Sequence, residues 1–565
     1  MQEIREKLKQ AIKELYNLDF EPEITPSPEN IDADYSTNVS LKLARELHKP
    51  PMVIAEELNN KLNVSISNPG FLNFTLSNEI LNKEINNLFS NFKEHIAFDK
   101  FAGKTVICEF SDPNPFKVLH VGHLYTSVVG DSISRLFEYA GAKVIRANFG
   151  GDVGLHVAKT MYALEKKSLE DLNIEDIAKC YVEGTTAYED DEAAKSEITK
   201  LNKEIYQINA DNLHDSNLAK LYWKGRELSY EYFENFYASI GLKFDKYYPE
   251  SSVAGLGLKT VKRELEKGVY KMSDGAVIFD GEKFGLHTRV FINKEGVPTY
   301  EAKDVGLIFT KWEDYHFDKS VVITGNEQLD YMKVVLKSVE QYAPELVEKT
   351  SHLTHGLVKL PGNEKMSSRK GNFLKAVDVI DMVKAELQNA YDSADEKVSL
   401  AALKYAFLKY KMGGNIIFDP KESVKMTGNS GPYLLYSAVR AKKILAKSEA
   451  LETVSRNSYE NFEVSEAHND GPERTRSREL QVSERSLMKK VLEYKPMLHE
   501  AVVEMAPHKV ANFLYELAQE FSRFYENCQV TGSAEEKERL KLVKVYLDIV
   551  THGLNILGIN IPEEM

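Results

Sequence analysis

The sequence predicts an α/β fold, and one stretch, Thr105 to Gly154, carries most of the evidence. Residues 105–110 are apolar and β-branched, as in a buried strand. Apolar side chains then recur at three-to-five-residue intervals up to Ala140, as on one face of a helix, and Gly141 is placed to end that helix. A second strand pattern follows at residues 143–149. A strand–helix–strand unit of this kind indicates a parallel, doubly wound sheet.

Length and composition bound the possibilities. With 565 residues the chain is too long for a single core, and three or four domains are expected. Acidic residues outnumber basic ones by 86 to 72, which gives a formal net charge of −14. This balance argues against a protein that binds nucleic acid indiscriminately, but it leaves room for an RNA partner that meets a locally basic face.

The cysteines Cys108, Cys180 and Cys528 are widely spaced and form no C-x-x-C pair. Neither a disulfide framework nor a zinc site is therefore expected, and Cys108 fits the core of a strand. The first residues have the pattern of a charged amphipathic helix without an apolar signal core, and no apolar run reaches membrane-spanning length. We therefore expect a cytoplasmic protein with no membrane contact.

The chain divides into three predicted parts. Residues 1–95 indicate a small α+β module, in which the stretch 64–77 alternates apolar and polar residues around Pro69-Gly70, as in a hairpin. Residues 96–380 contain the sheet, interrupted at about 161–250 by a charged, mostly helical stretch that we interpret as an insertion.

Strand signals vanish beyond about residue 380, and residues 381–565 predict an all-helical domain. Helical periodicity is found at 399–412, 432–447, 483–504 and 508–527. The segment 455–480 is polar and poor in aliphatic residues, which favours a mobile loop.

A first functional motif, His120-Val121-Gly122-His123, lies where the first predicted helix begins. Backbone N–H groups at a helix N-terminus attract anions, and Gly122 lets a ligand approach closely. His120 and His123 share one helical face and can both donate to phosphate oxygens. Such a pair alone is weak evidence, because histidines near a helix start are more often surface or core residues than catalysts.

A second motif far downstream strengthens the case. His355-Gly356-Leu357-Val358 is followed by Lys365-Met366-Ser367-Ser368-Arg369-Lys370-Gly371-Asn372, which by itself reads as a solvated basic loop. Together and in this order the two motifs resemble the HIGH and KMSKS motifs of class I aminoacyl-tRNA synthetases. The stretches EFSDPNPFKVLHVGH, GDVG at 151–154, YEAKDVG at 300–306 and GPYLLYSAVR resemble arginyl-tRNA synthetases in particular, and the resemblance runs over nearly the whole chain.

The resemblance implies a fold and an activity. Residues 96–380 would form a Rossmann-type catalytic domain, residues 1–95 a module that contacts the tRNA elbow, and residues 381–565 an anticodon-binding domain. The enzyme would be an arginine–tRNA ligase, which makes arginyl-adenylate and pyrophosphate from arginine and ATP and then transfers arginine to the 3′ end of tRNA(Arg). We expect a monomer that uses Mg²⁺ brought by ATP, has no zinc and no metal site of its own, and needs bound tRNA before it activates arginine.

The resemblance also implies an ATP site. Its expected residues are His120, Gly122, His123, His355, Leu357, Val358 and Met366, and the expected catalytic groups are His120, His123, Lys117, Lys365, Ser367 and Lys370. The second motif departs from its pattern at Ser368, where the family has a lysine. Because arginyl-type enzymes that lack this lysine commonly carry one before the first motif, we infer that Lys117 substitutes for it; the alternative is a solvated turn lysine.

Recognition of arginine has to distinguish its planar guanidinium fork from the ammonium of lysine, which carboxylates in bidentate geometry achieve. Asp304 and Glu109 are the candidates for charge recognition, and Tyr300 lies on the same predicted helical face as Asp304. The resemblance assigns Asn114 and His156 to the α-amino and carboxylate end of the substrate. His156 stands where glutamine is more usual, and Asn326 is a weaker candidate of the same kind.

Two sets of residues are candidates for tRNA contact. Phe71, Asn73 and Phe74 match a PGFxNF-like sequence in the N-terminal domains of the family, with a core role for both phenylalanines as the alternative. Tyr433, Tyr436 and Arg440 form one stripe of a predicted helix, for which a core stripe is the alternative, while Leu434, Leu435 and Val439 would face the core. Tyr525 and Met565 also match family positions near the anticodon.

Two other functions compete with an arginine–tRNA ligase. Another class I synthetase would share both ATP motifs, but no zinc-ligand pattern or large editing domain is found in the sequence. A catalytically inactive relative that only binds RNA is opposed by the intact histidines, Lys117 and the KMSS stretch.

Overall fold

The computed structural model describes residues 2–28, 31, 33–167, 172–362, 374–393, 395–459 and 480–565. They form two compact units. The smaller unit consists of residues 1–92, 451–493 and 520–545, and the larger of residues 93–450, 494–519 and 546–565.

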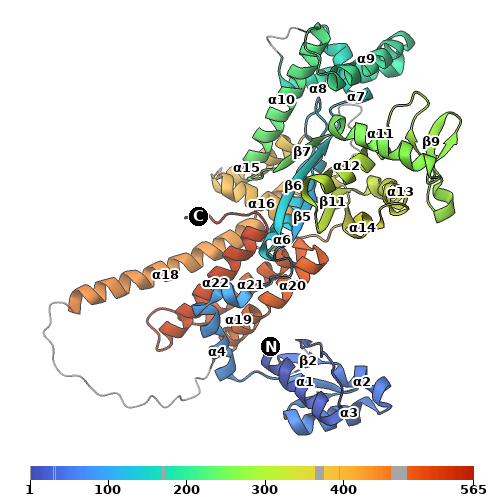
Figure 1. Cartoon of the computed structure of the whole chain (residues 1–565). Helices are drawn as coiled ribbons and strands as arrows, with labels where there is room; N and C mark the ends of the chain where they lie inside the picture. Colours follow the sequence, from blue (N-terminus) through green and yellow to red (C-terminus); the bar gives the residue numbers. More distant parts are fainter. Residues whose placement is uncertain are drawn as a thin grey trace. The chain divides into compact units, whose positions relative to one another are not determined.

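The larger unit is built on a five-stranded sheet in which every strand pair is parallel (Figure 1). The strands are β5 (Thr105–Glu109), β6 (Lys143–Gly150), β7 (Lys246–Pro249), β11 (Lys319–Gly325) and β12 (Thr350–His355), in the order β12-β11-β5-β6-β7. Helix α6 (Val121–Tyr139) connects β5 to β6, and Gly141 follows it with a φ of 85°, which glycine adopts without strain. The doubly wound α/β fold predicted from the sequence is confirmed.

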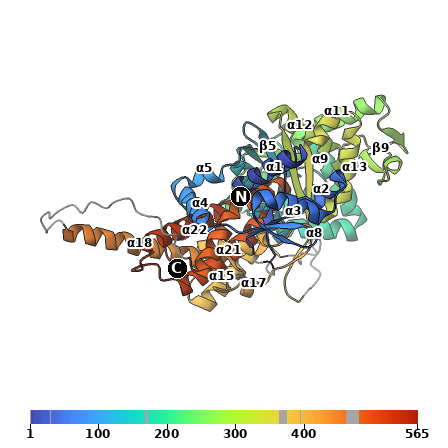
Figure 2. The same ribbon diagram turned by 90° about the horizontal axis from the view of Figure 1, so that it is seen from below.

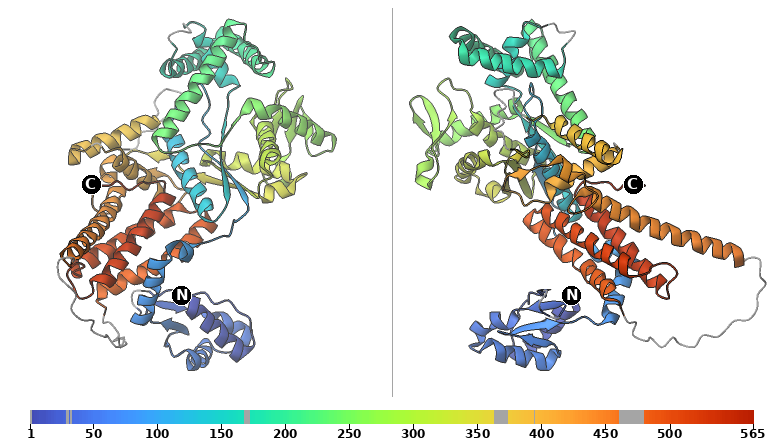
Figure 3. Two further views of the ribbon diagram at one scale, coloured as in Figure 1. Left: turned by 60° about the vertical axis from the view of Figure 1, so that its left-hand side comes forward. Right: turned by 180° about the vertical axis from the view of Figure 1, so that it is seen from behind.

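The predicted insertion is helical and has a core of its own. It contains α7 (Leu155–Leu164), α8 (Ile174–Asp190), α9 (Glu192–Ala210) and α10 (Asn217–Ser239), with Ile177, Ile198 and Ile205 among its buried residues. Helix α10 runs from α8 and α9 to the sheet (Figures 1 and 3). There the hydroxyl of Ser229 accepts a hydrogen bond from the backbone N–H of Phe116 at 2.9 Å, so α10 supports the loop that leads into α6.

Further elements complete the larger unit around the sheet. They are α11 (Glu250–Glu266), β8 (Lys271–Ser273), β9 (Ala276–Phe279), η1 (Gly281–Phe284), β10 (Arg289–Ile292), α12 (Tyr300–Tyr315), η2 (Asn326–Gln328), α13 (Leu329–Glu340), α14 (Pro344–Glu348), β13 (Val358–Lys359), α15 (Ala376–Tyr391), α16 (Glu396–Leu408), β14 (Ile416–Ile417) and α17 (Pro420–Ser423). Strands β8, β9 and β10 make a small antiparallel sheet beside α11, away from the large sheet (Figures 1 and 2).

Helices α11 and α12 pack with their backbones in direct contact. A Cβ atom added at Gly257 would lie 1.9 Å from the carbonyl oxygen of Ala302, and one added at Gly306 would lie 2.2 Å from the carbonyl oxygen of Val253. Only glycine permits so close an approach. This contact matters for function because α11 and α12 begin with Glu250 and Tyr300, which both line the large cavity of this unit.

The N-terminal module contains α1 (Gln2–Tyr16), β1 (Thr25–Pro26), β2 (Tyr35–Thr37), α2 (Val39–Leu47), α3 (Pro51–Leu62), β3 (Ser65–Ser67) and β4 (Phe71–Phe74), followed by α4 (Asn78–Ser90) and α5 (Phe92–Ile96). Strands β3 and β4 form the antiparallel hairpin predicted around Pro69-Gly70. Asn73 is buried, with its side chain hydrogen-bonded to Ser36 and Ser67, and Phe74 is buried too. These two side chains therefore serve the core of the module, and Phe71 is half-buried.

The C-terminal part is helical as predicted, with one exception. Its helices are α18 (Gly431–Tyr459), α19 (Val482–Leu492), α20 (Tyr494–Glu504), α21 (Pro507–Asn527) and α22 (Glu536–Ile556). The expectation that no strand follows residue 380 is wrong, since β14 pairs in parallel with β13. Of the predicted mobile loop 455–480, residues 455–459 belong to α18 and residues 460–479 lie outside the described part of the chain. Within that described part, no helix has the length and apolar character needed to cross a bilayer.

The contact between α11 and α12 leads to a stability prediction. Gly257→Ala should destabilise the protein by at least about 1–3 kcal/mol, because two backbones must separate to admit the methyl group. Gly255→Ala is the matched control: it lies on the same helix with nothing within 4 Å of the added Cβ, so alanine should stabilise the helix by about 0.5–1 kcal/mol. Urea unfolding measures both, and equal unfolding midpoints for the two variants would contradict the close packing.

Candidate active site

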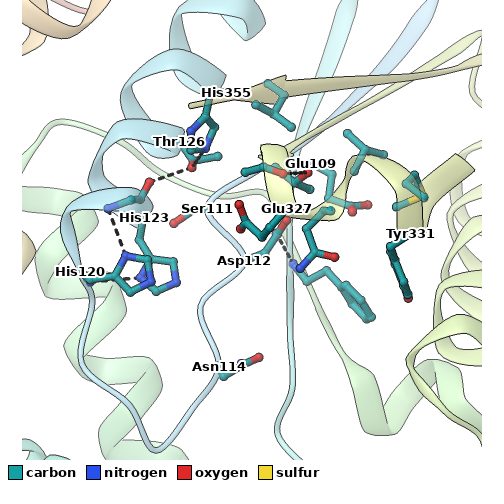
Figure 4. A pocket seen from close by; sticks show the side chains of 18 of the residues that line it. Glu109, Ser111, Asp112, Asn114, His120, His123, Thr126, Glu327, Tyr331 and His355 are labelled. Carbon is teal, nitrogen blue, oxygen red and sulfur yellow. Dashed lines mark hydrogen bonds between the residues drawn. The ribbon is translucent and has the colours of Figure 1, made fainter. Parts of the chain in front are cut away.

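A cavity of about 1050 Å³ opens at the carboxyl ends of the parallel strands. It lies where the strand order changes direction, between β5 and β11, which is where ligands bind in open α/β sheets. In Figure 4, His120 and His123 lie at one side of this cavity and Tyr331 at the other, with Glu109, Asp112 and Glu327 between them.

The histidine pair is held by backbone hydrogen bonds that fix its tautomers. Nδ1 of His120 accepts from the backbone N–H of Gly122, and Nδ1 of His123 accepts from the backbone N–H of His120, both at 3.1 Å. In the neutral rings the proton is therefore on Nε2, and both Nε2–H groups are donors. The rings stack with centroids 3.7 Å apart, and Gly122 is required here because a Cβ atom would lie 2.8 Å from the His120 ring.

Electrostatics keep both rings neutral near pH 7. Burial, followed by the positive charge of Lys117, lowers the pKa of His120 to about 4. Burial, followed by the proximity of His120, places the pKa of His123 well below its usual value. The pair therefore offers neutral N–H donors at the N-terminus of α6, an arrangement that binds phosphate oxygens.

The second predicted motif reaches the same end of the cavity. His355, Leu357 and Val358 line it, and Nε2 of His355 lies 2.6 Å from Oγ1 of Thr126 on α6. Leu357 is 62% exposed, so an apolar surface faces an incoming ligand. The sequence-predicted residues of the first and second motifs are thus brought together.

Lys365, Met366, Ser367 and Lys370 lie outside the described residues. The chain on either side of this segment borders the cavity, because Lys359 and Leu374 both line it. The carbonyl of Leu374 accepts a hydrogen bond from the backbone N–H of Val121 at 2.9 Å. The roles predicted for the four residues stay predictions.

The opposite end of the cavity is rich in carboxylates. Glu109, Asp112, Glu250, Glu301, Asp304 and Glu327 line it. Carboxylate oxygens gathered in this number suit a ligand that carries several cationic N–H donors. Asp304 receives a hydrogen bond from the hydroxyl of Tyr331, and burial raises its pKa to about 8, helped by the charge of Glu109. Tyr300, one helical turn before Asp304, also lines the cavity, and its side chain is 56% exposed. It therefore lies on the same helical face as Asp304, as the sequence predicts.

Glu109, a predicted candidate for charge recognition, belongs to a buried ion pair. Its Oε2 lies 2.6 Å from Nζ of Lys311, and both side chains are buried. Lys311, two turns along α12 from Asp304, balances the charge of this carboxylate. Glu109 still borders the cavity, so it can contribute an oxygen atom there without a net charge.

Of the other residues predicted to contact the substrate, Asn114 lines the cavity, whereas His156 and Asn326 do not. Oδ1 of Asn114 accepts from the backbone N–H of Gly151 at 2.8 Å. His156 lies behind this wall, with Nε2 2.7 Å from the carbonyl oxygen of Gly151, and burial lowers its pKa to about 3. Asn326 is turned away, since its amide donates to the carbonyl of Gly413 at 2.9 Å. We therefore place His156 as a support of the wall and leave Asn326 out of the site.

Sequence reasoning missed several cavity residues, namely Glu250, Arg289, Glu301, Glu327, Gln328 and Tyr331. The sequence contains a pattern that could have identified some of these residues. Glu250 comes directly after β7, as Glu109 ends β5, and Glu327-Gln328 follows β11. Polar residues at the carboxyl ends of parallel strands meet at one edge of the sheet, so these positions could have been proposed.

A smaller cavity of about 300 Å³ lies beside the histidine pair. It shares Asn114, His120 and His123 with the large cavity and is lined by Lys117 and by Tyr181 of α8. Nζ of Lys117 lies 4.5 Å from the centre of the Tyr181 ring. The predicted basic residue therefore lies next to the histidine pair, half-buried and over an aromatic ring, and not in a fully solvated turn.

The predicted RNA-binding stripe on α18 is partly exposed. Leu434, Leu435 and Val439 are buried, as predicted. Tyr436 is 42% exposed, and Arg440 covers its ring with a guanidinium carbon 4.7 Å from the ring centre.

The other candidates for RNA contact differ in exposure. Tyr433 is half-buried, with its ring 5.8 Å from that of Tyr515. Tyr525 is exposed and Met565 half-buried.

Within the described ranges, no group of three or more His, Cys, Asp or Glu side chains is arranged to hold a metal ion. Four of the six carboxylates of the large cavity are bonded to other side chains: Glu109 to Lys311, Glu250 to Lys303, Glu301 to Arg289 and Asp304 to Tyr331.

Comparison with known proteins agrees with this geometry. A family model described as "tRNA synthetases class I (R), catalytic domain" matches residues 84–419. The fold and the site thus define a class I aminoacyl-tRNA synthetase. Models of the "Arginyl tRNA synthetase N terminal domain" and the "DALR anticodon binding domain" match residues 2–76 and 434–565. The chain belongs to the arginyl-tRNA synthetase family, and the predicted activity, that of an arginine–tRNA ligase, is confirmed.

Individual relatives span the whole chain. The arginine–tRNA ligase of Treponema denticola is 28% identical, over 96% of this chain and 94% of its own length. The arginyl-tRNA synthetase structures from Thermus thermophilus and Plasmodium falciparum are 22% and 20% identical, each with a TM-score of 0.77. They cover all of this chain and 100% and 99% of their own, and they support the fold.

The buried pair of Glu109 and Lys311 gives a second stability prediction. Lys311→Met should cost about 3–5 kcal/mol, because it leaves a carboxylate buried without its partner. The double variant Glu109→Gln/Lys311→Met should recover most of that loss, and urea unfolding of the single and double variants measures it. Additive losses in the double variant would contradict a paired arrangement.

Proposed function

We propose that both substrates of adenylate formation bind in the large cavity, with ATP at the histidine end and arginine at the carboxylate end. The observation that carries this proposal is the separation of hydrogen-bond donors and carboxylate acceptors within one cavity. Neutral N–H donors at a helix N-terminus form one end, and an excess of carboxylates forms the other.

In the first step a carboxylate oxygen of arginine forms a bond to the α-phosphorus of ATP. The bond from that phosphorus to the bridging oxygen breaks, and pyrophosphate leaves with the electron pair. Negative charge grows on the α-phosphate oxygens, where the Nε2–H groups of His120 and His123 are placed to donate. Each fixed donor of this kind lowers the barrier by about 3–4 kcal/mol. Their neutrality means that they need not lose a proton when the product leaves.

At the other end Asp304, with Tyr331 and Tyr300, recognises the guanidinium group. Lysine, which lacks the planar fork, would leave the buried carboxylate of Asp304 without a bidentate partner. Glu250, whose Oε2 lies 2.5 Å from Nζ of Lys303, completes this wall together with Asn114. We assign these two residues to the α-amino end of arginine.

Mg²⁺ enters with ATP, since phosphate oxygens supply most of its ligands and the protein needs no dedicated cage. Lys117 contacts the departing pyrophosphate from the smaller cavity, together with the predicted Lys365 and Lys370.

In the second step the 3′-terminal ribose hydroxyl of tRNA(Arg) attacks the arginyl carbonyl, and AMP leaves. We propose that Tyr436, Arg440 and Tyr525 contact the anticodon region, and Phe71 the elbow. The three predicted domains, 1–95, 96–380 and 381–565, would then bind the elbow, catalyse the reaction and bind the anticodon. We further propose a monomer that works in the cytoplasm, where its tRNA substrate is used.

Replacing Lys117 tests the pyrophosphate assignment. Lys117→Met should lower the rate of arginine-dependent pyrophosphate exchange at least tenfold, since one cation on the leaving group is lost. Lys166→Met is the control, because Lys166 also covers a tyrosine ring, at 4.7 Å from Tyr162, but does not line either cavity. An unchanged exchange rate in Lys117→Met would refute the role of Lys117.

Titration of Asp304 tests the arginine assignment. The ionised carboxylate binds the guanidinium group, so kcat/KM for arginine should rise as the pH rises through about 8, the pKa to which burial raises Asp304. Asp304→Asn should lower kcat/KM for arginine by 100-fold or more and remove this limb of the profile. The same limb persisting in Asp304→Asn would assign it to another group and contradict the proposal.

A further inference from the structure

A buried acidic residue of the catalytic domain has no role in the function proposed above. Asp152, in the GDVG stretch after β6, is completely buried, yet its side chain does not line either cavity. A buried carboxylate is costly unless it is paired and hydrogen-bonded. Its partners therefore indicate what it does.

The partners of Asp152 come from two other segments of the chain. Oδ1 accepts from the backbone N–H of Ser251 at 3.0 Å, and Oδ2 accepts from the hydroxyl of Ser251 at 2.7 Å. Oδ2 also accepts from Nε of Arg226 at 3.0 Å. Asp152 thus joins the insertion helix α10, which carries Arg226, to the first turn of α11.

The sheet explains why these groups meet. Strands β6 and β7 pair in parallel with Gly150 opposite Pro249, so the residues that follow both strands lie at the same edge. Pro249, the N-cap residue of α11, offers no side-chain cap. The carboxylate of Asp152 supplies that cap from outside the helix, where it also favours the positive end of the helix dipole.

The cap formed by Asp152 fixes the position of Glu250. This glutamate is the first residue of α11, next to Ser251, and its side chain lies between Nζ of Lys303 and Gly151. A Cβ atom at Gly151 would lie 2.9 Å from Oδ1 of Asn114 and 3.0 Å from Oε1 of Glu250. The two residues assigned above to the α-amino end of arginine, Asn114 and Glu250, therefore both contact Gly151, which immediately precedes Asp152.

Arg226 completes the arrangement from the insertion. Its guanidinium carbon lies 5.7 Å from the ring centre of Trp223 and 5.0 Å from that of Tyr230. The hydroxyl of Tyr222 donates to the backbone carbonyl of Asp152 at 3.2 Å. One turn of α10 thus holds Asp152 by its side chain and by its backbone.

We propose that Asp152 and Arg226 are positioning residues for arginine: the insertion helix α10, through this ion pair, sets the place of Glu250 and hence the affinity of the site for the amino acid. The inference rests on the assignment of Glu250 to the arginine end of the cavity. Neither residue touches the substrate. The nucleotide end, held by α6 and β12, does not depend on the pair.

The test is pyrophosphate exchange by the full-length enzyme with bound tRNA, in which KM for arginine, KM for ATP and kcat are measured separately. Arg226→Met should raise KM for arginine about tenfold and change KM for ATP by less than twofold. Arg226→Lys, which keeps the charge, should restore much of the affinity. Arg263→Met removes an ion pair with the buried carboxylate of Glu264 further along α11, where Lys267 remains as a partner, and should change neither KM.

The variant Glu250→Gln, alone and combined with Arg226→Met, distinguishes the positioning role of Arg226 from the assignment of Glu250 to arginine. Glu250→Gln alone should raise KM for arginine; if it does not, the assignment of Glu250 fails and the inference falls with it. In the Glu250→Gln background, Arg226→Met should add less than twofold to KM for arginine. Two results would overturn the positioning role while the assignment of Glu250 stands. In the first, Glu250→Gln raises KM for arginine but Arg226→Met does not. In the second, Arg226→Met raises KM for arginine and KM for ATP equally.

A milder variant covers the case in which Arg226→Met does not fold. Ser251→Ala removes only the hydroxyl bond to Asp152 and keeps the backbone bond. It should raise KM for arginine about threefold with KM for ATP unchanged. An unchanged KM for arginine in Ser251→Ala, in an enzyme that folds normally, would overturn the proposal.

Discussion

Parallel pairing of the five strands is the constraint on which the site depends. In this register Gly150 lies opposite Pro249, and Gly325 opposite His355. The polar residues that follow these strands are far apart in the sequence, yet they converge at one edge of the sheet. A shift of any strand by one residue would turn its side chains to the other face and remove its contribution from the cavity.

The two ends of the cavity differ in their polar groups, as the proposed binding of two unlike substrates requires. The histidine end has neutral donors, because burial and a nearby lysine depress the pKa values of His120 and His123. The other end has several carboxylates, of which Glu109 and Glu250 are balanced by buried lysines. Pairing keeps these carboxylates ordered while limiting the cost of burying them. Asp304, bonded to a neutral tyrosine, remains responsive to an incoming cation.

The fold and the position of the first histidine motif at the start of a helix could be predicted from the sequence, because both depend on local patterns. Apolar periodicity fixes β5, α6 and β6, and the histidine motif lies within a single helical turn. Long-range pairing could not be predicted. Glu109 was predicted as a candidate for charge recognition, and nothing in the sequence reveals that Lys311, 202 residues away, is its ion-pair partner.

Asn326 and Glu327 illustrate the same limit at shorter range. Adjacent residues in η2 make different contacts: the side chain of Asn326 donates to the carbonyl of Gly413, and Glu327 lines the cavity. The direction of a side chain in a short irregular turn depends on tertiary contacts that periodicity does not encode. Phe74 and Asn73 likewise match a family motif for RNA contact, but burial in the hairpin decides their role.

The central claim is that one cavity holds the adenylate with its phosphate at His120 and His123 and its guanidinium group at Asp304. A crystal structure with a non-hydrolysable arginyl-adenylate analogue tests it most directly. The account predicts phosphate-mimic oxygens within hydrogen-bond distance of Nε2 of His120 or His123, and guanidinium nitrogens within that distance of Asp304. An analogue bound in the reverse direction, or outside the edge formed by β5 and β11, would contradict it.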